Sequence, residues 1–480
     1  MTNQNVVSGG IVGVVLFATS ASAVAAVFRV TTTGAGIGNT WGTACNLDYA
    51  LSHGVSGDSI WVKKGTYYRG GVGPVPLNWG VKLIGGFAGT ESYASQSNPT
   101  LNLTILHGGL SDTDPSPRGR VVVSGTYDSN APTNVPLLRG FKIMNGKTAD
   151  DDFDGGGGMR LDYSALIVRC EFAGNQALWA GAAVAIHGDG FPSFVNCAFH
   201  DNGVASDALN IDVDAAPIAG GALYSYSGRA TFVNCLFYNN KAGEGGALWI
   251  NWLSNPTFTN CTFVKNHSKV NPGGAIYDSG GTTTARNCIF WNNTMPLLLV
   301  DFGTQIYDPE SGTLVSYSDV QGGWGGTANF NLDPLFVNPG VDYYQLQQNS
   351  PCKNSGNNSA LPFDLGDLDW DTDVSEVIPK DLVPSQRRVG VNVDVGAYEY
   401  QELFAFCNTS LDCISGRACC GNTCEACCTD GDCPAFAHHC ITDGLNVCVQ
   451  CLNDTHCSSG KECCPDNTCE TIGMCPVGPE

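Results

Sequence analysis

Charge, and positive charge above all, is scarce in this 480-residue sequence. Asp, Glu, Lys and Arg make up 14% of the residues, whereas about 25% is usual in soluble domains. The 23 basic residues face 45 acidic ones, which gives a net charge of −22. A chain this acidic repels nucleic-acid phosphates and anionic membrane surfaces. We therefore expect no nucleic-acid partner.

Motifs that identify common enzymes are also missing. The sequence contains no GxSxG, no phosphate-binding loop and no HxxxH pair, so it predicts no nucleophile elbow, nucleotide site or zinc-protease site. The sequence therefore identifies no catalytic residue, and the catalytic residues are unknown. Met is rare, with 5 residues, while Gly reaches 60 and hydrophobic residues 43%. This composition disfavours a helical bundle and indicates a β-rich, turn-dense chain with a large core and more than one domain.

Long apolar runs are confined to the amino terminus. Residues 11–28 read IVGVVLFATSASAVAAVF and contain two Ala-x-Ala sites, which is the pattern of a signal peptide. We predict that residues 1–25 are a signal peptide, that the protein is exported, and that the mature chain has no membrane-spanning segment. A retained membrane anchor is the alternative, because no Lys or Arg precedes Arg29. The Ser and Thr within the run disfavour that anchor.

The middle of the chain carries an internal repeat. Five copies of Cys-x-Phe-x-x-Asn begin at Cys170, Cys197, Cys235, Cys261 and Cys288, with spacings of 27, 38, 26 and 27 residues. A small-residue pair, such as Gly220-Gly221, lies between successive copies. A period near 27 built from short β-prone runs and turn residues is typical of one coil of a parallel β-helix.

Each repeated residue type has a structural interpretation within a coil. Cys and Phe at i and i+2 point to the same side of a strand, so they predict two stacked inward columns. The Asn before each Cys, as in Asn196, fits a left-handed corner, and Arg169 at that position predicts a different turn. The stacked Cys are expected to be free core thiols. Disulfides between neighbouring coils, or a metal site, are the alternatives.

Motifs on both sides of the repeat resemble those of known families. GGA[LI] alternating with FxxN resembles the repeat of the polymorphic outer-membrane proteins, which are bacterial surface β-helix proteins. Segments such as Gly57–Val62, Leu83–Glu91, Asp333–Phe336 and Asp394–Glu399 resemble the choice-of-anchor Q class of right-handed parallel β-helix proteins. This resemblance covers about residues 30–400 and implies a right-handed β-helix from about Ser59 to about Val320, with roughly ten coils. The aromatic and Pro residues after Asn331 are then expected to cover the last coil.

The carboxy-terminal residues hold most of the Cys. Sixteen of the 23 Cys lie in residues 407–480, and a pattern with doubled Cys recurs after 44 residues. In an exported chain this density predicts disulfides; the Cys-x-x-Cys pairs and two nearby His leave zinc as the alternative. The predicted disulfide residues are Cys407, Cys413, Cys419, Cys420, Cys424, Cys427, Cys428, Cys433, Cys440, Cys448, Cys451, Cys457, Cys463, Cys464, Cys469 and Cys475.

The predicted fold class is therefore all-β, a pectate-lyase-like right-handed parallel β-helix followed by a small disulfide-rich module. The predicted segments are a signal peptide (residues 1–25), a β-helix with an amino-terminal cap (26–330), a carboxy-terminal cap region (331–400), a linker (401–406) and the module (407–480).

Three acidic groups are the candidate binding sites. The first is residues 150–154; the others supply the calcium candidates, which are Asp207, Asp212, Asp214, Asp367, Asp369, Asp371 and Asp373. The last four alternate like a calcium loop but lack the Gly and Glu of an EF-hand. Calcium is the one cofactor that these groups suggest, and solvated loops without a ligand are the alternative.

Function follows from export and architecture only in outline. We expect a secreted or cell-surface β-helix, a monomer without catalysis, which serves binding, adhesion or envelope structure with a carbohydrate or a cell-surface protein as partner. The alternative is a carbohydrate-active enzyme, a polysaccharide lyase or glycoside hydrolase, because β-helices hold both kinds of protein. Two converging carboxylates, or an Asp beside Arg or Lys, would distinguish the alternative.

Overall fold

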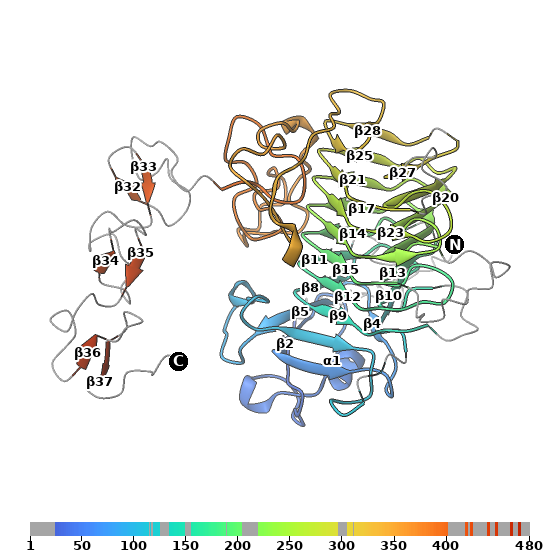
Figure 1. Ribbon diagram of the computed structural model, residues 1–480. Helices are drawn as coiled ribbons and strands as arrows, with labels where there is room; N and C mark the ends of the chain where they lie inside the picture. The colour runs from blue at the N-terminus through green and yellow to red at the C-terminus, as the bar shows by residue number, and fades with distance from the viewer. Residues whose placement is uncertain are drawn as a thin grey trace, which may run out of the picture.

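Three long parallel sheets form the body of the protein (Figure 1). The computed structural model describes residues 25–401 except 115, 117–118, 125–133, 149–154, 189, 204–218, 296–304 and 311; beyond residue 401 it describes only the backbone of six short strands. The predicted signal peptide, the first acidic group, Asp207, Asp212, Asp214 and the side chains of the module lie outside the described residues.

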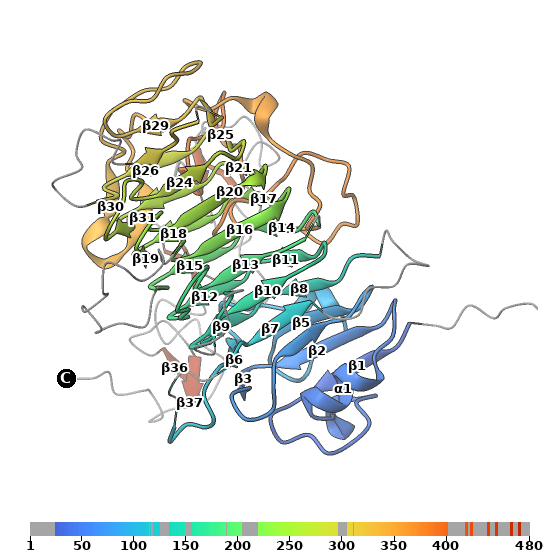
Figure 2. The same cartoon turned by 90° about the vertical axis from the view of Figure 1, so that its right-hand side faces the viewer.

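Every neighbouring pair in these three sheets is parallel (Figure 2). The ten-strand sheet contains β1 (Val27–Val30), β2 (Ser59–Lys63), β5 (Lys82–Phe87), β8 (Leu137–Arg139), β11 (Leu166–Val168), β14 (Ser193–Val195), β17 (Thr231–Val233), β21 (Thr257–Thr259), β25 (Thr284–Arg286) and β28 (Leu314–Ser316). The nine-strand sheet contains β3 (Gly65–Tyr68), β6 (Thr104–His107), β9 (Lys142–Met144), β12 (Glu171–Ala173), β15 (Ala198–His200), β18 (Leu236–Tyr238), β22 (Thr262–Val264), β26 (Ile289–Trp291) and β29 (Asp319–Val320). The eight-strand sheet contains β4 (Val75–Leu77), β7 (Val122–Ser124), β10 (Met159–Leu161), β13 (Val184–Ile186), β16 (Leu223–Gly228), β20 (Leu248–Ser254), β24 (Ile276–Ser279) and β27 (Ile306–Tyr307).

From β2 onward the chain visits the three sheets in turn, so each full coil adds one strand to each sheet, which confirms the parallel β-helix that the repeat predicted. The first strand comes earlier than expected, because β1 pairs with β2 in register from Val27 opposite Ser59. The helix α1 (Leu47–His53) follows; the Asn46 side chain accepts a hydrogen bond from the Tyr49 backbone N–H at its start. Its apolar side chains join the core at the amino-terminal end of the stack.

The remaining elements are short. They are the 3-10 turns η1 (Trp41–Thr43), η2 (Ala94–Gln96), η4 (Pro339–Val341) and η5 (Asn358–Ala360), and the strand pairs β19 (Lys241–Ala242) with β23 (His267–Ser268) and β30 (Phe336–Asn338) with β31 (Tyr343–Leu346). In the module three antiparallel pairs are described: β32 (Ala418–Cys420) with β33 (Thr423–Glu425), β34 (His439–Ile441) with β35 (Val447–Val449), and β36 (Lys461–Cys463) with β37 (Cys469–Thr471). Among the described residues, no helix is long and apolar enough to cross a membrane.

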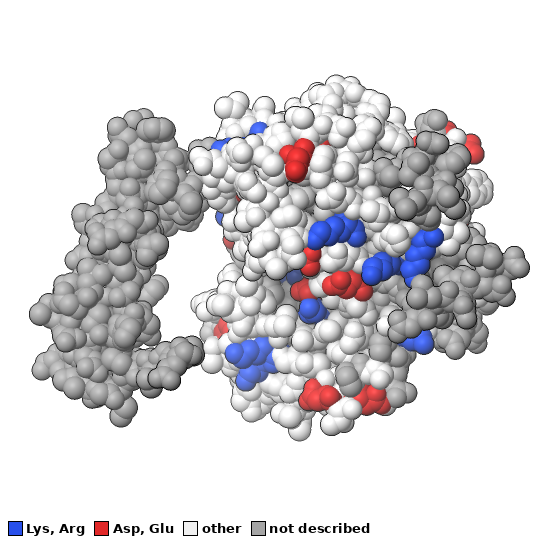
Figure 3. Space-filling model, in the orientation of Figure 1, with Lys and Arg blue, Asp and Glu red and all other residues white. Residues whose placement is uncertain are grey.

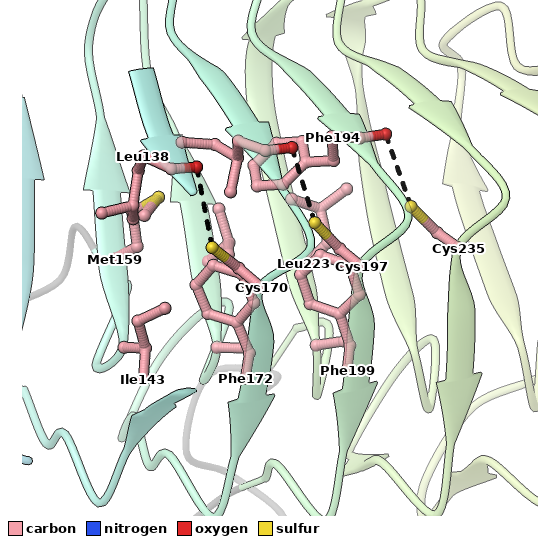
Figure 4. Close-up of a cluster of buried hydrophobic side chains, with 14 of the residues drawn as sticks. Leu138, Ile143, Met159, Cys170, Phe172, Phe194, Cys197, Phe199, Leu223 and Cys235 are labelled. Carbon is pink, nitrogen blue, oxygen red and sulfur yellow. Dashed lines mark hydrogen bonds between the residues drawn. The ribbon is translucent and has the colours of Figure 1, made fainter. Parts of the chain in front are cut away.

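The inward columns of Cys and Phe are confirmed (Figure 4). The five stacked Cys are buried free thiols that donate to backbone carbonyls of the preceding coil, as Cys197 does to Ile167 at 3.5 Å. Rings of the Phe column stack at 4.6–4.9 Å between neighbouring coils. Burial of each such side chain contributes about 1.5–3 kcal/mol, so the repeat itself supplies the core.

A further column, polar and not predicted from the repeat, is buried beside the Phe rings. It consists of the last Asn of each repeat, namely Asn175, Asn202, Asn240, Asn266 and Asn293. Each amide Nδ2 of the first four donates to the Oδ1 of the Asn on the next coil at 2.8–3.0 Å. The same Nδ2 also donates to a backbone carbonyl of the preceding coil, as Asn266 does to Phe237 at 2.9 Å. These Asn therefore satisfy backbone groups that the strand ladders leave unpaired.

The corner before each repeat Cys is left-handed, as predicted. Asn196, Asn234, Asn260 and Asn287 have φ values of 51–54°. The prediction of a different turn at Arg169 is wrong, because its φ is 50°. Its guanidinium donates to the Leu368 carbonyl at 2.8 Å, so a longer side chain takes over the donor role that the Asn amides have at this corner.

Residues 331–401, here called the flanking segment, do not lie where the sequence predicted. They run along the side of the stack (Figure 1), where Phe336, Tyr344 and Leu346 pack on the outer face of the nine-strand sheet. Its backbone carbonyls accept hydrogen bonds from the corner amides, for example Asp394 from Asn260 at 2.8 Å and Lys380 from Asn234 at 2.8 Å.

The last coil is covered by other residues. Trp324 packs partly buried against the main core, and Phe330 pairs with Asp319 of β29 in a parallel bridge. The prediction that the residues after Asn331 cover the last coil is therefore corrected. Residues just after Val320 provide the cover, and the flanking segment connects several coils laterally. The side-chain amides of the corner Asn need hydrogen-bond acceptors, and the flanking segment supplies them where it lies beside these corners.

Candidate functional site

Four predicted calcium ligands lie in one loop of the flanking segment, residues 364–376. One carboxylate oxygen each of Asp367, Asp369 and Asp371 lies within 4.8 Å of the others. Asp373 differs, because its Oδ1 accepts hydrogen bonds from the Ser375 backbone N–H and hydroxyl at 2.9 and 2.6 Å. The structure thus brings together three of these four side chains.

A second group in the same loop includes residues that the sequence did not assign as ligands. Oxygens of Asp364, Asp369 and Glu376 also lie within 4.8 Å of one another. An antiparallel bridge between Phe363 and Val377 closes the loop, with the Asp364 N–H donating to the Glu376 carbonyl at 2.9 Å. The sequence carries no local pattern that predicts this bridge. The one available signal for Glu376 was its acidic side chain close after the Asp-rich run.

Two buried arginines hold this loop against the coils. The Arg139 guanidinium donates to the carbonyls of Gly366 and Asp367 at 2.8 and 3.0 Å, and it lies 3.9 Å from the centre of the Trp370 ring. Burial, together with neighbouring Arg169, lowers the pKa of Arg139 to about 9. Leu368 packs against Val168. The loop therefore has a fixed position on the stack.

A cleft of about 480 Å³ opens on the same side of the stack, and Arg169, which binds the loop, also lines it. Its walls come from residues 97–103, from the outer face of β9, β12 and β15, and from Leu382 and Pro384 of the flanking segment. Figure 3 shows positive and negative side chains close together over these strands, in the middle of a face that is otherwise mostly uncharged. Lys142, Arg169 and Glu171 line the cleft.

Two of the charged side chains of the cleft, Lys142 and Glu171, are paired with each other. Glu171 Oε1 lies 2.6 Å from Lys142 Nζ and 2.8 Å from His200 Nε2, and His200 Nδ1 lies 2.7 Å from Asp201 Oδ2. Burial opposes ionisation of Glu171, but its hydrogen bonds with His200 and Lys142 prevail and lower its pKa to about 2. Burial also opposes protonation of His200, but bonds to Asp201 and Glu171 prevail and raise its pKa.

This pairing limits what the cleft can do chemically. A glycoside hydrolase needs two carboxyl groups, one of them kept protonated by a raised pKa. Glu171 is the one carboxylate among the described residues that line the cleft, and its lowered pKa keeps it ionised. Among the described lining residues the cleft therefore presents one ionised carboxylate next to the cationic groups of Lys142 and Arg169.

A row of exposed aromatic side chains follows the other side of the stack. Four such residues lie on four successive coils: Tyr163 and Phe191 follow β10 and β13, and Tyr226 and Trp252 lie within β16 and β20. Their exposed fractions are 45%, 59%, 46% and 67%. The Phe191 N–H donates to Oγ of Ser164, the residue after Tyr163, and β16 pairs with β20 on either side of Tyr226 and Trp252. We call these four residues the aromatic row.

The aromatic row adjoins a column of stacked rings, because the Tyr226 ring lies 6.4 Å from the Tyr224 ring and 5.9 Å from the His187 ring. Tyr224, Trp249 and Tyr277 on the eight-strand sheet stack face to face, at 5.1 and 6.3 Å with interplanar angles of 18° and 6°. Their ring faces are therefore used within the protein. Trp252 is exposed instead, and both it and Glu310 lie beside Gly280. Large exposed aromatic groups in sequence along a surface are typical of ligand or partner sites.

The fold and its repeat define the class of the protein: it is a right-handed parallel β-helix. The family model described as "Right handed beta helix region" matches residues 132–318. Among solved structures the chain is similar to pectate lyase Pel9A, with a TM-score of 0.38, 12% identity, and coverage of 78% of this chain and 96% of that chain. No curated protein matches the sequence. The finer resemblance to the choice-of-anchor Q class and to polymorphic outer-membrane proteins stays a prediction.

Proposed function

We propose that this protein is an exported or surface-displayed bacterial β-helix that binds an extended, uncharged polysaccharide along the aromatic row and does not cleave it. The observation that carries the proposal is the row itself: four exposed rings on four successive coils. With coils about 4.8 Å apart, the row spans roughly 15 Å. That length suits a linear chain better than a compact small molecule.

The chemistry of the row favours sugars. The apolar C–H face of a sugar ring packs on an aromatic ring, and aromatic side chains supply large contact areas at a low cost in side-chain entropy. The flanking charges are one of each sign: Arg229 lies 5.9 Å from the Phe191 ring, and Glu310 lies near Trp252 across Gly280. The net charge of −22 repels acidic polysaccharides, so an uncharged chain is the expected ligand.

Binding of sugars by the row can be tested with insoluble polysaccharides. We expect the protein to sediment with at least one uncharged polysaccharide from a panel of β-glucans, chitin and xylan, and not with pectate or alginate. Trp252→Ala should weaken that binding about tenfold, since loss of the largest and most exposed ring of the row costs about 1.4 kcal/mol or more. The matched control is Tyr93→Ala, because Tyr93 is equally exposed at 70% and lies outside the row.

Two results would contradict this proposal. One is binding that Trp252→Ala leaves unchanged. The other is binding to none of the uncharged polysaccharides, and sedimentation with acidic polysaccharides alone would in addition refute the charge argument.

A carbohydrate-active enzyme is the second candidate, and the cleft with Arg169 and Lys142 is the observation that favours it. An enzyme would release soluble oligosaccharides from the bound polysaccharide. We expect none, because Glu171 is held ionised. If products do appear, Glu171→Gln shows whether they arise in the cleft: loss of product release would support the enzyme and overturn the purely binding function.

A further inference from the structure

The loop of residues 364–376 gathers more negative charge than its surroundings neutralise. Five carboxylates, those of Asp364, Asp367, Asp369, Asp371 and Glu376, meet there in two overlapping groups. The positive groups that face them are the guanidiniums of Arg139 and Arg169. Two positive charges against five negative ones leave an excess of three negative charges at this place.

Asp364 is the side chain that makes the cluster more than an exposed acidic patch. It is 0% exposed. Its Oδ2 accepts a hydrogen bond from the Leu368 N–H at 2.6 Å, but its buried Oδ1 has no hydrogen-bond partner. A buried carboxylate oxygen without a partner is costly. Oε1 of Glu376, across the loop mouth, is also buried and without a partner.

The nearby arginines do not supply that partner. Their described hydrogen bonds go to the backbone carbonyls of Gly366, Asp367 and Leu368. These bonds fix the loop and turn its carboxylates toward one another. Three oxygen donors within 4.8 Å of one another form the hard, anionic donor set that calcium prefers, and the set contains no sulfur or imidazole ligand that would favour zinc or copper.

We propose that Asp364, Asp369 and Glu376 bind a calcium ion that fixes the 364–376 loop on the side of the β-helix. Glu376 lines an open depression of about 910 Å³, which gives the ion a path from solvent. Asp367 and Asp371 lie in the overlapping group around Asp369 and add negative charge at the site. The proposal is independent of polysaccharide binding, because the aromatic row lies on other elements.

A water network between Asp364 and the two arginines is the competing account of the orphaned oxygen. Both Arg139 Nη2 and Arg169 Nε are buried without a hydrogen-bond partner, so water could connect them to the carboxylate. This account predicts a loop that binds no metal ion. The two accounts therefore differ in a direct binding measurement.

Terbium luminescence provides that measurement in the full-length protein. Terbium replaces calcium at oxygen sites, and Trp370, which lies between Asp369 and Asp371 in the sequence, can transfer excitation energy to it. We expect saturable, Trp-excited terbium emission from the wild-type protein that calcium abolishes by competition. Asp364→Asn and Glu376→Gln should each weaken binding at least tenfold.

The control is Asp373→Asn, which removes one charge from the same loop at a residue outside the 4.8 Å group of Asp364. It should retain wild-type affinity. Circular dichroism checks that each variant folds. If Asp364→Asn does not fold, Glu376→Gln at the loop mouth provides the test alone. Equal binding by wild type and both ligand variants would overturn the proposal. Absence of calcium-competed emission from the wild type would overturn it as well and support the water network.

Discussion

At the scale of single residues, two kinds of Asn do different work within one repeat. The corner Asn provides a left-handed backbone and an amide that reaches outward to the flanking segment, as Asn260 does to Asp394. The last Asn of the repeat is buried and links successive coils, as Asn266 does to Asn293. One residue type therefore satisfies backbone groups at both ends of the strands of the nine-strand sheet.

Replacing one buried Asn should be costly. In Asn266→Ala the Asn240 backbone N–H and the Phe237 carbonyl lose their hydrogen bonds to the Asn266 side chain, and the Asn240 amide loses one of its two acceptors. Each buried unsatisfied group costs about 1–3 kcal/mol, so the free energy of unfolding should fall by about 3 kcal/mol or more in urea denaturation. Asn255→Ala, at an exposed Asn on the same coil, should change it by less than about 0.5 kcal/mol. A similar small change for both variants would contradict the role of the column.

At the scale of elements, the attachment of the flanking segment buries ionisable groups. Asp319 of β29 is 0% exposed; its oxygens accept hydrogen bonds from the Leu332 N–H at 3.1 Å and the Cys352 thiol at 3.3 Å. Burial raises the pKa of Asp319 to about 7 despite these bonds. Burial likewise raises the pKa of Asp381 and of Glu399 to about 7. The contact between segment and coils thus contains carboxyl groups that favour the protonated form.

Stability should therefore depend on pH through Asp319 in a direction opposite to that of a salt-bridged carboxylate. The unfolded pKa is about 4, so the native state binds the proton more tightly. The contribution of this group is most favourable below pH 4 and is lost as the pH rises to about 7. Relative to wild type, Asp319→Asn should gain on the order of 3 kcal/mol in unfolding free energy between pH 4 and pH 8. Urea unfolding of both proteins across this range measures the difference, and parallel pH profiles would refute it.

The sequence predicted the coils well because their determinants are local and periodic. Cys197 and Phe199 point inward wherever a strand of this period forms, and Asn196 favours its corner without help from distant residues. The flanking segment has no period, and its contacts join residues far apart in sequence, such as Arg139 and Gly366. The acidic loop was found from its alternating Asp, but Glu376 was not, because its approach to Asp364 depends on the Phe363–Val377 bridge.

At the scale of the whole molecule, the two Cys populations divide the chain. The seven Cys of the described β-helix and flanking segment are buried and free. Burial raises the pKa of the Cys170 thiol to about 12 and those of Cys235, Cys261 and Cys288 well above the usual value. A thiol that stays protonated is a poor nucleophile, so these Cys resist oxidation while they remain in the core.

A reductant should therefore distinguish the β-helix from the predicted disulfide module. We expect the thermal unfolding of the β-helix to be the same with and without reductant, because no disulfide occurs among its described Cys. Native alkylation followed by intact-mass measurement should modify none of the seven buried thiols before reduction, and up to sixteen further Cys after it. Loss of β-helix structure on reduction, or rapid alkylation of the buried Cys without denaturant, would contradict this division.

The flanking segment also has a mechanical consequence. A solenoid pulled from its ends can come apart one coil at a time, because each coil contacts only its neighbours. Here one continuous stretch of chain accepts hydrogen bonds from corner side chains of successive coils, from Arg169 at Leu368 to Asn287 at Asn357. Tension applied along the axis must then break these lateral bonds together with the coil contacts. The coils from Arg139 to Asn287 are therefore expected to resist force as one unit, while the coils before Arg139 yield separately.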